Sequence, residues 1–555
     1  MKTFHKYPSQ LRDSLNIIIK YIGYSIIPLG IIMFYKNYTI LNDSYNESIL
    51  NTSAALIGMI PEGLIILTSI ALAVGVINLA KNKTLVQELY CLETLARVDI
   101  LCFDKTGTLT ENKMFVDKYS SYSHEFNVAI SNLIHDLEDD NSTIQAIKDY
   151  FSPKSTYECK EIIPFNSTNK YSGCIYKEGT YLLGAYRYMT NQYDSTIINE
   201  IEEASSNGYR VITLMKDNTV LGLIYLLDKI REDAYETLNY FRKQDVNIKI
   251  ISGDHPLTIC HIAKRIGLNN YEHYVDMTDI KDDEIDDLIE NTTIFARVTP
   301  HQKKLIIQSL KKHGHTVGIV GDGVNDVLAF KEADVSIAMN NGCDIAKSSA
   351  NLVLLESNFN ALPQVLYEGR RVINNIQIVA TLFLTKTIYS ILLTLITILF
   401  SFEYPFEPIH LTFVSTLTIG LPAFFMALEP NKKRVENRFL GNIIKVSIPH
   451  GISVVLCILI LNLITNDLTK YALIILAING CIVLTKVSKP FTLLRKIVLI
   501  FAYIGIILGL LFFNKLLNIN QIIINDFIYI IFILLFLLIV SLLGTKLIEK
   551  LYKHK

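Results

Sequence analysis

The sequence predicts a multi-domain membrane protein that combines an α-helical transmembrane bundle with a large water-exposed α/β part. Half of the 555 residues are hydrophobic, and the mean hydropathy is +0.32. Long apolar blocks lie at both ends of the chain, with a polar block between them. Inside the polar block, short β-branched runs alternate with helix-like stretches, as in a buried parallel sheet; these runs are 98–103, 246–252 and 315–322.

Eight apolar segments are long enough to cross a bilayer. The first two cover 15–35 and 50–80, and the second is too long for one straight span and is interrupted by Pro61. No small-residue cleavage site follows the first segment, so we interpret it as an anchor rather than a signal peptide. The other six lie near 377–402, 409–428, 444–464, 470–487, 495–515 and 526–546.

The charge pattern of the loops predicts the orientation. An even number of spans places both termini on the same side. Lys and Arg gather in 431–438, 486–496 and 546–555, whereas the opposite loop 402–408 has none. Because positive charge stays in the cytoplasm, we predict a multi-pass protein of the cell membrane, in contact with lipid, whose termini and polar block are cytoplasmic.

Composition excludes some partners. The net charge of −1 provides no basic field for nucleic acid. Eight Cys are scattered without a CxxC pair, which fits a reducing compartment and removes the easiest route to a soft-metal site.

The stretch DILCFDKTGTLTENK (99–113) carries the strongest chemical signal. A strand that ends in Asp104 and is followed by a small turn places a carboxylate at the carboxyl edge of a sheet, where open α/β folds build their sites. Such a carboxylate can attack the γ-phosphorus of ATP and hold the phosphoryl group as an acyl phosphate. Thr106 and Gly107 offer donors to the phosphoryl oxygens. An ordinary strand and turn with an exposed acid is the simpler alternative.

DKTGTLT (104–110) resembles the phosphorylation signature of the P-type ATPases, whose catalytic domain has the haloacid-dehalogenase-like fold. The resemblance implies phosphorylation of Asp104, with Lys105 and Thr106 as further catalytic residues. It also implies that an α+β nucleotide-binding domain is inserted into the phosphorylation domain, and that ATP and Mg²⁺ are the cofactors.

Further segments match this family in its own order. FARVTPHQK (295–303) is similar to the segment that supplies a phosphate-neutralising lysine, here Lys303. SGD is similar to the family's TGD element, with Ser for Thr. This match implies cofactor contacts by Ser252, Gly253 and Asp254.

GDGVND (321–326) is similar to the family's magnesium-binding loop. A transferring phosphoryl group needs a divalent cation and positive charge around its oxygens. Asp322 and Asp326 are suited as hard oxygen ligands, and Asn325 lies nearby to orient the phosphate. Alone, the hexapeptide could be a Gly/Asn turn. The implied Mg²⁺ ligands are Asp104, Thr106, Asp322 and Asp326.

The block before Asp228 resembles the family's nucleotide-binding domain. PFNSTNK (164–170) matches the segment in which an aromatic ring stacks on adenine and a lysine lies near the phosphates, here Phe165 and Lys170. GYRV resembles the element whose arginine reaches the phosphates, here Arg210, and DKIR (228–231) resembles the hinge Asp–Arg pair. For each short motif, a core Phe or a solvated cation is the alternative. Where the family has KGAPE, this chain has LGAYR, with Leu183 in place of the lysine.

The second apolar segment contains a candidate ion site. Pro61 cannot donate to the carbonyl of Ile57, and free carbonyls in a membrane need protein, water or an ion. Glu62 lies beside that break, and an intramembrane carboxylate is a functional candidate by default. Broken helix and carboxylate together predict a hard, oxygen-rich cation site; a kinked helix whose Glu faces an aqueous vestibule is the alternative. IPEGL resembles the fourth-helix motif of calcium, sodium and proton-potassium pumps.

Later spans depart from the calcium-pump pattern. Ile419 stands where an Asp is usual, and Thr387 and Ser390 stand where amide and carboxylate ligands occur. Lys386 lies in the same span, either as a built-in counter-ion or with its ammonium reaching the interface. The sequence of residues 84–110, together with LTIGLPAFF, is most similar to a bacterial group called cation-transporting ATPase E. That resemblance favours Ca²⁺ as the transported cation.

The resemblance divides the chain into four parts. Residues 1–80 form two transmembrane helices, 81–115 and 228–375 the phosphorylation domain, 116–227 the nucleotide-binding domain, and 376–555 six transmembrane helices. The family's TGE loop does not occur, so we expect the actuator domain and the first two spans of the family to be missing. A fragment, a frame-shifted gene and a two-chain pump, with a separate chain supplying the actuator, are all compatible with this.

The sequence therefore predicts a P-type ATPase that couples ATP hydrolysis to cation transport. Two alternatives remain: a degenerate or truncated member that does not pump, and a membrane-anchored phosphatase of the haloacid-dehalogenase type. The phosphatase alternative leaves the broken helix at Pro61 unexplained.

Overall fold

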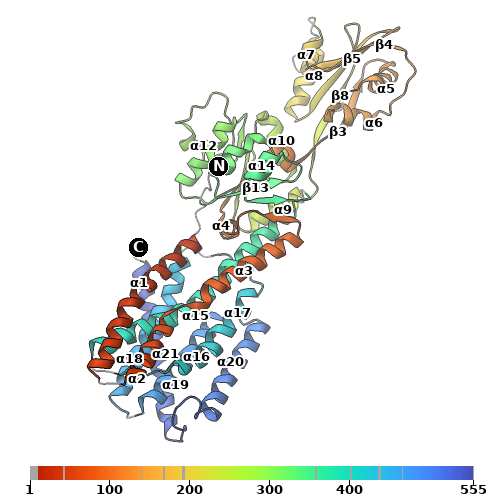
Figure 1. Cartoon of the computed structure of the whole chain (residues 1–555). Helices are drawn as coiled ribbons and strands as arrows, with labels where there is room; N and C mark the ends of the chain where they lie inside the picture. The colour runs from red at the N-terminus through yellow and green to blue at the C-terminus, as the bar shows by residue number, and fades with distance from the viewer. Residues whose placement is uncertain are drawn as a thin grey trace. The chain divides into compact units, whose positions relative to one another are not determined.

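The structure is a computed structural model. It describes residues 10–41, 44–138, 141–166, 169–190, 194–356, 359–400, 403–435, 439–465 and 467–553. Contacts divide the chain into two compact units (Figure 1). We call them the α/β unit, which consists mainly of Ala80–Cys91 and Val98–Gln364, and the helical unit, which consists mainly of Tyr7–Leu79 and Val365–Lys555.

The first sheet of the α/β unit has eight strands in the order β1-β14-β13-β12-β2-β9-β11-β10. The strands are β1 (Thr84–Val86), β2 (Ile100–Phe103), β9 (Asn247–Ile251), β10 (Tyr274–Asp276), β11 (Ile294–Ala296), β12 (Val317–Gly321), β13 (Val335–Met339) and β14 (Leu352–Leu354). All neighbours are parallel except β1 and β14. The three runs predicted as buried parallel strands are β2, β9 and β12, and β2 lies between the other two.

Helices and short turns connect these strands. They are a π-helical turn η1 (Lys105–Leu109), α9 (Ala234–Lys243), α10 (Pro256–Arg265), α11 (Ile285–Leu288), α12 (Pro300–Lys312), a 3-10 turn η2 (Val324–Asp326), α13 (Val327–Glu332) and α14 (Asp344–Ser349). Phe295, Ile319 and Phe330 belong to the core between sheet and helices. Because strands such as β2 and β12 are buried along their whole length, their β-branched and aromatic residues form continuous apolar runs.

The second sheet of the α/β unit is antiparallel, with six strands in the order β3-β8-β7-β6-β5-β4. Its strands are β3 (Thr110–Ser121), β4 (Cys159–Ile163), β5 (Tyr171–Tyr176), β6 (Gly179–Gly184), β7 (Arg210–Lys216) and β8 (Thr219–Ile230). The accompanying helices are α5 (Phe126–Asp136), α6 (Ser142–Tyr150), α7 (Tyr186–Met189) and α8 (Ser195–Ser206). The predicted domain boundaries at 115/116 and 227/228 fall inside β3 and β8, and the two sheets belong to one compact unit. The domain limits therefore stay a prediction.

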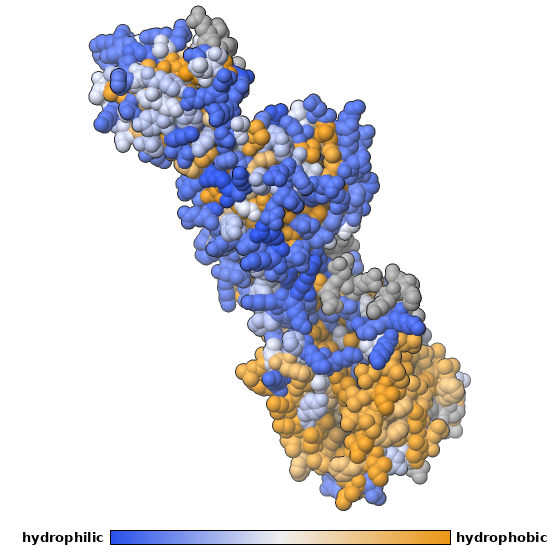
Figure 2. Space-filling model, turned by 180° about the vertical axis from the view of Figure 1, so that it is seen from behind, coloured by the Kyte–Doolittle hydropathy of each residue, from blue (hydrophilic) through white to orange (hydrophobic). Residues whose placement is uncertain are grey.

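The described part of the chain contains eight helical segments that are long and apolar enough to span a membrane, in agreement with the number predicted. Their helices are α1 (Gln10–Thr39), α2 (Tyr45–Met59) with α3 (Glu62–Lys81), α15 (Ala361–Leu399), α16 (Pro408–Ser415) with the π turn η3 (Thr416–Gly420) and α17 (Leu421–Leu428), α18 (Phe439–Asn462), α19 (Leu468–Val487), α20 (Leu493–Phe512) and α21 (Asp526–Lys553). The short helix α4 (Cys91–Arg97) contributes mostly to the same unit. Figure 2 shows an outer surface of these helices that is almost continuously apolar, as lipid contact requires.

The second span is broken where the sequence predicts it. α2 ends at Met59 and α3 begins at Glu62, with Ile60 in an extended conformation between them. Pro61 lacks the amide that would continue the hydrogen bonding, so the two helices cannot merge.

Candidate active site

Asp104 follows β2 directly and lies at the carboxyl edge of the parallel sheet. Its backbone amide donates to the carbonyl of Val320 (2.9 Å), which ties it to the end of β12. Its carboxylate Oδ1 accepts a hydrogen bond from the amide of Lys105 (2.8 Å). The side chain is held at the sheet edge where open α/β folds place their reactive groups.

Lys303 and Asp326 complete a charged cluster around Asp104. The Lys303 ammonium lies 3.1 Å from Asp104 Oδ2 and 2.7 Å from Asp326 Oδ1, and it is buried. Lys303 occupies the first turn of α12, which Thr299 and Gln302 fix through a reciprocal capping box. The cap therefore positions a buried ammonium in contact with the Asp104 carboxylate.

Burial dominates the electrostatics of this cluster. Desolvation raises the pKa of Asp104 to about 7, although the Lys303 ammonium opposes the shift. Burial also raises the pKa of Asp322, against a hydrogen bond from Asn112. Burial alone would lower the pKa of Lys303, but the carboxylates of Asp104 and Asp326 outweigh it and raise that pKa. Crowded carboxylates with raised pKa values favour binding of a cation.

Three carboxylates of this cluster fit a hard divalent cation. Asp104, Asp322 and Asp326 each place a ligand atom within 4.8 Å of the others. Oxygen donors from partly buried carboxylates are those that Mg²⁺ prefers. Asp322 comes close because Gly107 has no side chain: φ at Gly107 is 66°, and a Cβ there would lie 1.6 Å from Asp322 Oδ2.

A second ion-pair cluster lies beside the first. The Lys105 ammonium is 2.7 Å from Asp228 Oδ2 and 2.5 Å from Asp254 Oδ2. Burial would lower the pKa of Lys105, but these two carboxylates raise it. Thr106 Oγ1 donates to Asp254 at 3.5 Å. The predicted residues Lys105, Thr106 and Asp254 are thus brought together, and Asp228 joins them.

Two further residues of this edge were not among the predicted site residues. Arg231 donates to the carbonyls of Thr108 (2.8 Å) and Gly107 (2.9 Å), which holds the turn after Asp104. Asn112 Nδ2 donates to Asp322 Oδ2 at 3.2 Å. Arg231 was recognised only as half of a hinge motif, and Asn112 lies inside the DKTGTLTENK stretch, where no spacing rule distinguishes it.

Ser252, Gly253 and Asn325 lie at the same edge, after β9 and β12. The amide of Ser252 donates to the Phe295 carbonyl (3.0 Å), and the amide of Val298 donates back to the Ser252 carbonyl (3.0 Å), which fixes the SGD turn. Asn325 is exposed on η2.

The predicted nucleotide residues are spread over the second sheet. Arg210 begins β7 and lines a cavity of about 480 Å³ together with Lys105 and Asp254. Phe165 is 48% exposed, and the Lys170 ammonium lies 4.7 Å from the centre of the Tyr188 ring. Neither residue lines that cavity. Leu183 is buried in the core beneath the sheet and offers no polar contact.

In the helical unit, the break at Pro61 lies against α15. The Ser390 hydroxyl packs against Gly58, where an added Cβ would lie 2.4 Å from its oxygen. Among the described residues, this buried hydroxyl has no hydrogen-bond partner. Thr387 Oγ1 donates to the Phe383 carbonyl (3.2 Å). Glu62 is exposed at the start of α3, and among the described residues no hydrogen bond joins its carboxylate to the hydroxyl of Thr387 or Ser390.

Lys386 does not reach an interface. It is 7% exposed and lines a small cavity with Thr418 and Asn479, between α15, η3 and α19. The alternative that its ammonium extends to the membrane surface is therefore wrong.

Comparisons with known proteins match this arrangement. A family profile of haloacid dehalogenase-like hydrolases matches residues 98–334. A Streptococcus pneumoniae protein named "Probable cation-transporting ATPase exp7" is 38% identical in an alignment of 558 positions that covers 94% of this chain and 71% of that protein. The calcium-transporting ATPase CtpE of Mycobacterium tuberculosis is 38% identical in an alignment of 472 positions that covers 80% of this chain and 59% of CtpE.

A solved structure shows the same fold. It is a zinc-transporting PIB-type ATPase in an E2.Pi state, with a TM-score of 0.56 and 22% identity, covering 73% of this chain and 62% of the other.

Proposed function

Because the chain belongs to the P-type cation-transporting ATPase family, we propose that it couples ATP hydrolysis to cation transport through a phosphorylated Asp104. The chain is a multi-pass membrane protein with cytoplasmic catalytic domains. The observation that carries the proposal is the position of Asp104 at the strand end, 3.1 Å from the buried Lys303 ammonium and beside two more carboxylates. A carboxylate with a purely structural role at a strand end would not require a buried ammonium and two further carboxylates around it.

The geometry supports attack by Asp104 on a terminal phosphate. An Asp104 oxygen bonds to the γ-phosphorus as the bond to ADP breaks, and Lys303 neutralises charge that spreads over the equatorial oxygens. Asp104, Thr106, Asp322 and Asp326 would hold Mg²⁺, which supplies further positive charge there when bound. Asn325, Ser252 and Gly253 are proposed phosphate contacts.

Mg²⁺ affinity should depend on pH through Asp104. Its pKa is raised to about 7, so below that pH Mg²⁺ must displace a proton. The raised pKa also means that the metal-free protein loses stability as pH rises from the ordinary carboxyl range toward 7. We expect apparent Mg²⁺ affinity to fall by up to about tenfold per pH unit below 7 and to level off above it. Mg²⁺-dependent thermal shifts across pH measure this, and Asp104→Asn should flatten the dependence. An equal slope in both proteins would contradict it.

The nucleotide base is proposed to stack on Phe165, with Lys170 and Arg210 near the phosphates. The exposure of Phe165 leaves its ring face open to a ligand, and Arg210 shares a cavity with Lys105 and Asp254.

Phe165→Ala should weaken ATP binding by about tenfold, because stacking on an aromatic ring contributes about 1–3 kcal/mol. Displacement of a fluorescent nucleotide measures it. Tyr274→Ala, which removes an exposed aromatic ring from β10 of the first sheet, should leave the affinity unchanged. Equal affinities in both variants and the wild type would remove Phe165 from the site.

The transported cation is proposed to be Ca²⁺, held by Glu62, Thr387 and Ser390. Relatives at 38% identity carry the name calcium-transporting ATPase, and oxygen ligands at a broken helix suit a hard cation. The unpartnered Ser390 hydroxyl beside Gly58 is a group that an ion or its water would satisfy. We propose Lys386 as the counter-ion when the site is empty.

The chain spans 59% of the length of CtpE. We propose that a separate chain can supply an actuator domain to it, and that the four-part division at 80, 115, 227 and 375 describes its domains.

A further inference from the structure

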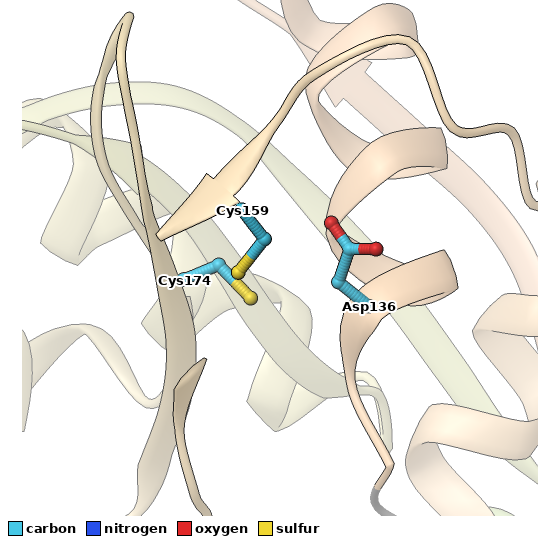
Figure 3. A group of neighbouring side chains, drawn as sticks. All are labelled: Asp136, Cys159 and Cys174. Carbon is cyan, nitrogen blue, oxygen red and sulfur yellow. The ribbon is translucent and has the colours of Figure 1, made fainter. Parts of the chain in front are cut away.

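A second group of candidate metal ligands lies outside the Asp104 site, beside the antiparallel sheet. Asp136, Cys159 and Cys174 place one ligand atom each within 4.8 Å of one another. Figure 3 shows the two sulfurs next to each other, on β4 and β5, with the Asp136 side chain beside them at the end of α5. The three residues come from separate elements, so the fold assembles the group.

The strand register explains how the two Cys meet without a CxxC spacing. Cys159 is opposite Tyr176 and Cys174 is opposite Ile162, with a bulge in β4 between these pairs. The two Cys are therefore diagonal neighbours rather than a directly opposed pair. The Cβ atoms of diagonal neighbours lie farther apart than the Cβ atoms of a disulfide. On one tetrahedral metal with metal–sulfur bonds of about 2.3 Å, the two sulfur atoms are not bonded to each other and lie roughly 3.8 Å apart.

Two neighbouring side chains hold the Asp136 carboxylate in place. The Tyr176 hydroxyl donates to Asp136 Oδ2 (2.8 Å), and His135 Nδ1 lies 2.7 Å from Asp136 Oδ1. Each oxygen retains a further lone pair for a metal. Outer partners of this kind fix the direction of ligating carboxylates in metal sites.

Burial differs between the two sulfurs in a way that suits a site open on one side. Cys174 is fully buried, whereas Cys159 is partly exposed. A metal can thus enter from the Cys159 side, and its bond to sulfur replaces the thiol proton of Cys174.

We propose that Asp136, Cys159 and Cys174 bind a thiophilic divalent cation of the Zn²⁺ class, with a water as the fourth ligand. Two sulfur donors and one oxygen favour Zn²⁺ over Mg²⁺ or Ca²⁺, which select oxygen alone. Binding forms two metal–sulfur bonds and releases two thiol protons to solvent, with no change in oxidation state.

The site has a consequence for the nucleotide, which rests on the proposed function. β4 is the edge strand of the sheet, and its residues are mostly exposed. The segment after β4 carries Phe165, and β5 begins directly after Lys170. A metal that joins β4, β5 and α5 would restrain the two strands that this connection links. We therefore expect Zn²⁺ to tighten ATP binding.

Co²⁺ is the direct probe, because a Co²⁺–thiolate bond gives a charge-transfer absorption that oxygen ligands do not. Co²⁺ added with excess Mg²⁺ to the full reduced chain in detergent should give this absorption, and Zn²⁺ should remove it by competition. Cys159→Ser should weaken Co²⁺ binding by about a hundredfold or abolish the band, and Asp136→Asn should weaken it by about tenfold or more. Cys260→Ser, a matched change at a partly buried Cys on α10, should change nothing.

A wild-type protein without the thiolate band, or a band unchanged in Cys159→Ser, would overturn the site. So would a thiol count two below eight in the metal-free protein kept without reductant, since that would make the two Cys a disulfide. A band with no effect of Zn²⁺ on ATP affinity would overturn only the coupling to Phe165. Failure of ATP to bind at all would overturn the proposed function while leaving the band in place.

Discussion

Asp104→Asn should abolish the acid-stable, hydroxylamine-labile label that [γ-³²P]ATP leaves on the chain. An amide nitrogen at this position cannot attack phosphorus to give an acyl phosphate, and no other described carboxylate combines a strand-end position with contact to Lys303. The loss should be complete rather than partial, because no second carboxylate in the described part of the chain is placed to take over.

Folding should survive this substitution. Asn has nearly the same shape, and it removes one of three crowded carboxylates whose burial already raises the Asp104 pKa. The melting temperature should therefore stay equal or rise, and ATP should still bind. Asp282→Asn is a matched control on the surface of the same unit, where Asp282 pairs with the exposed His301; it should label like wild type. A stable label in Asp104→Asn would assign the phosphate to another residue and refute the proposed mechanism.

The proximity of Asp104 and Asp322 was predictable from the sequence because of how parallel sheets are built. Asp104 follows β2 and Asp322 follows β12, and these strands are adjacent and parallel. Residues after such strands must meet at one edge. Lys303 could be placed only by family resemblance, since its contact depends on the direction of α12.

Contacts between distant segments were not predictable in the same way. Lys105 pairs with Asp228 across 123 residues, a contact that requires β8 to end beside the turn after Asp104. The Cys159–Cys174 pair depends on a single bulge in β4, and a local pattern of residue types does not reveal a bulge. The sequence-based expectation that scattered Cys leave no easy soft-metal site was based on their spacing along the chain. Which Cys lie next to each other is decided instead by the register of the strands.

Glu62→Gln should raise the Ca²⁺ concentration needed for half-maximal phosphorylation by about tenfold or more, while ATP affinity stays near wild type. The substitution keeps the size of the side chain and removes only its charge, and net ligand charge is a main determinant of Ca²⁺ affinity. The break between α2 and α3 comes from Pro61 and should persist. The change would then report on ion binding and not on helix geometry.

The measurement is phosphorylation from ATP as a function of free Ca²⁺, in the full chain purified in lipid. Glu47→Gln is a matched control on the same broken span, because Glu47 is exposed in the first turn of α2 and caps that helix through Ser44. It should cost helix stability of about 1 kcal/mol or less and leave the Ca²⁺ dependence unchanged. If both variants kept the wild-type Ca²⁺ dependence, Glu62 would be a carboxylate that faces an aqueous vestibule beside a kinked helix. If only Glu62→Gln shifted the Ca²⁺ dependence, Glu62 would be an ion ligand. Because a ligand has to contact its ion, the exposed Glu62 side chain would then turn toward the Ser390 side of the break when the ion binds.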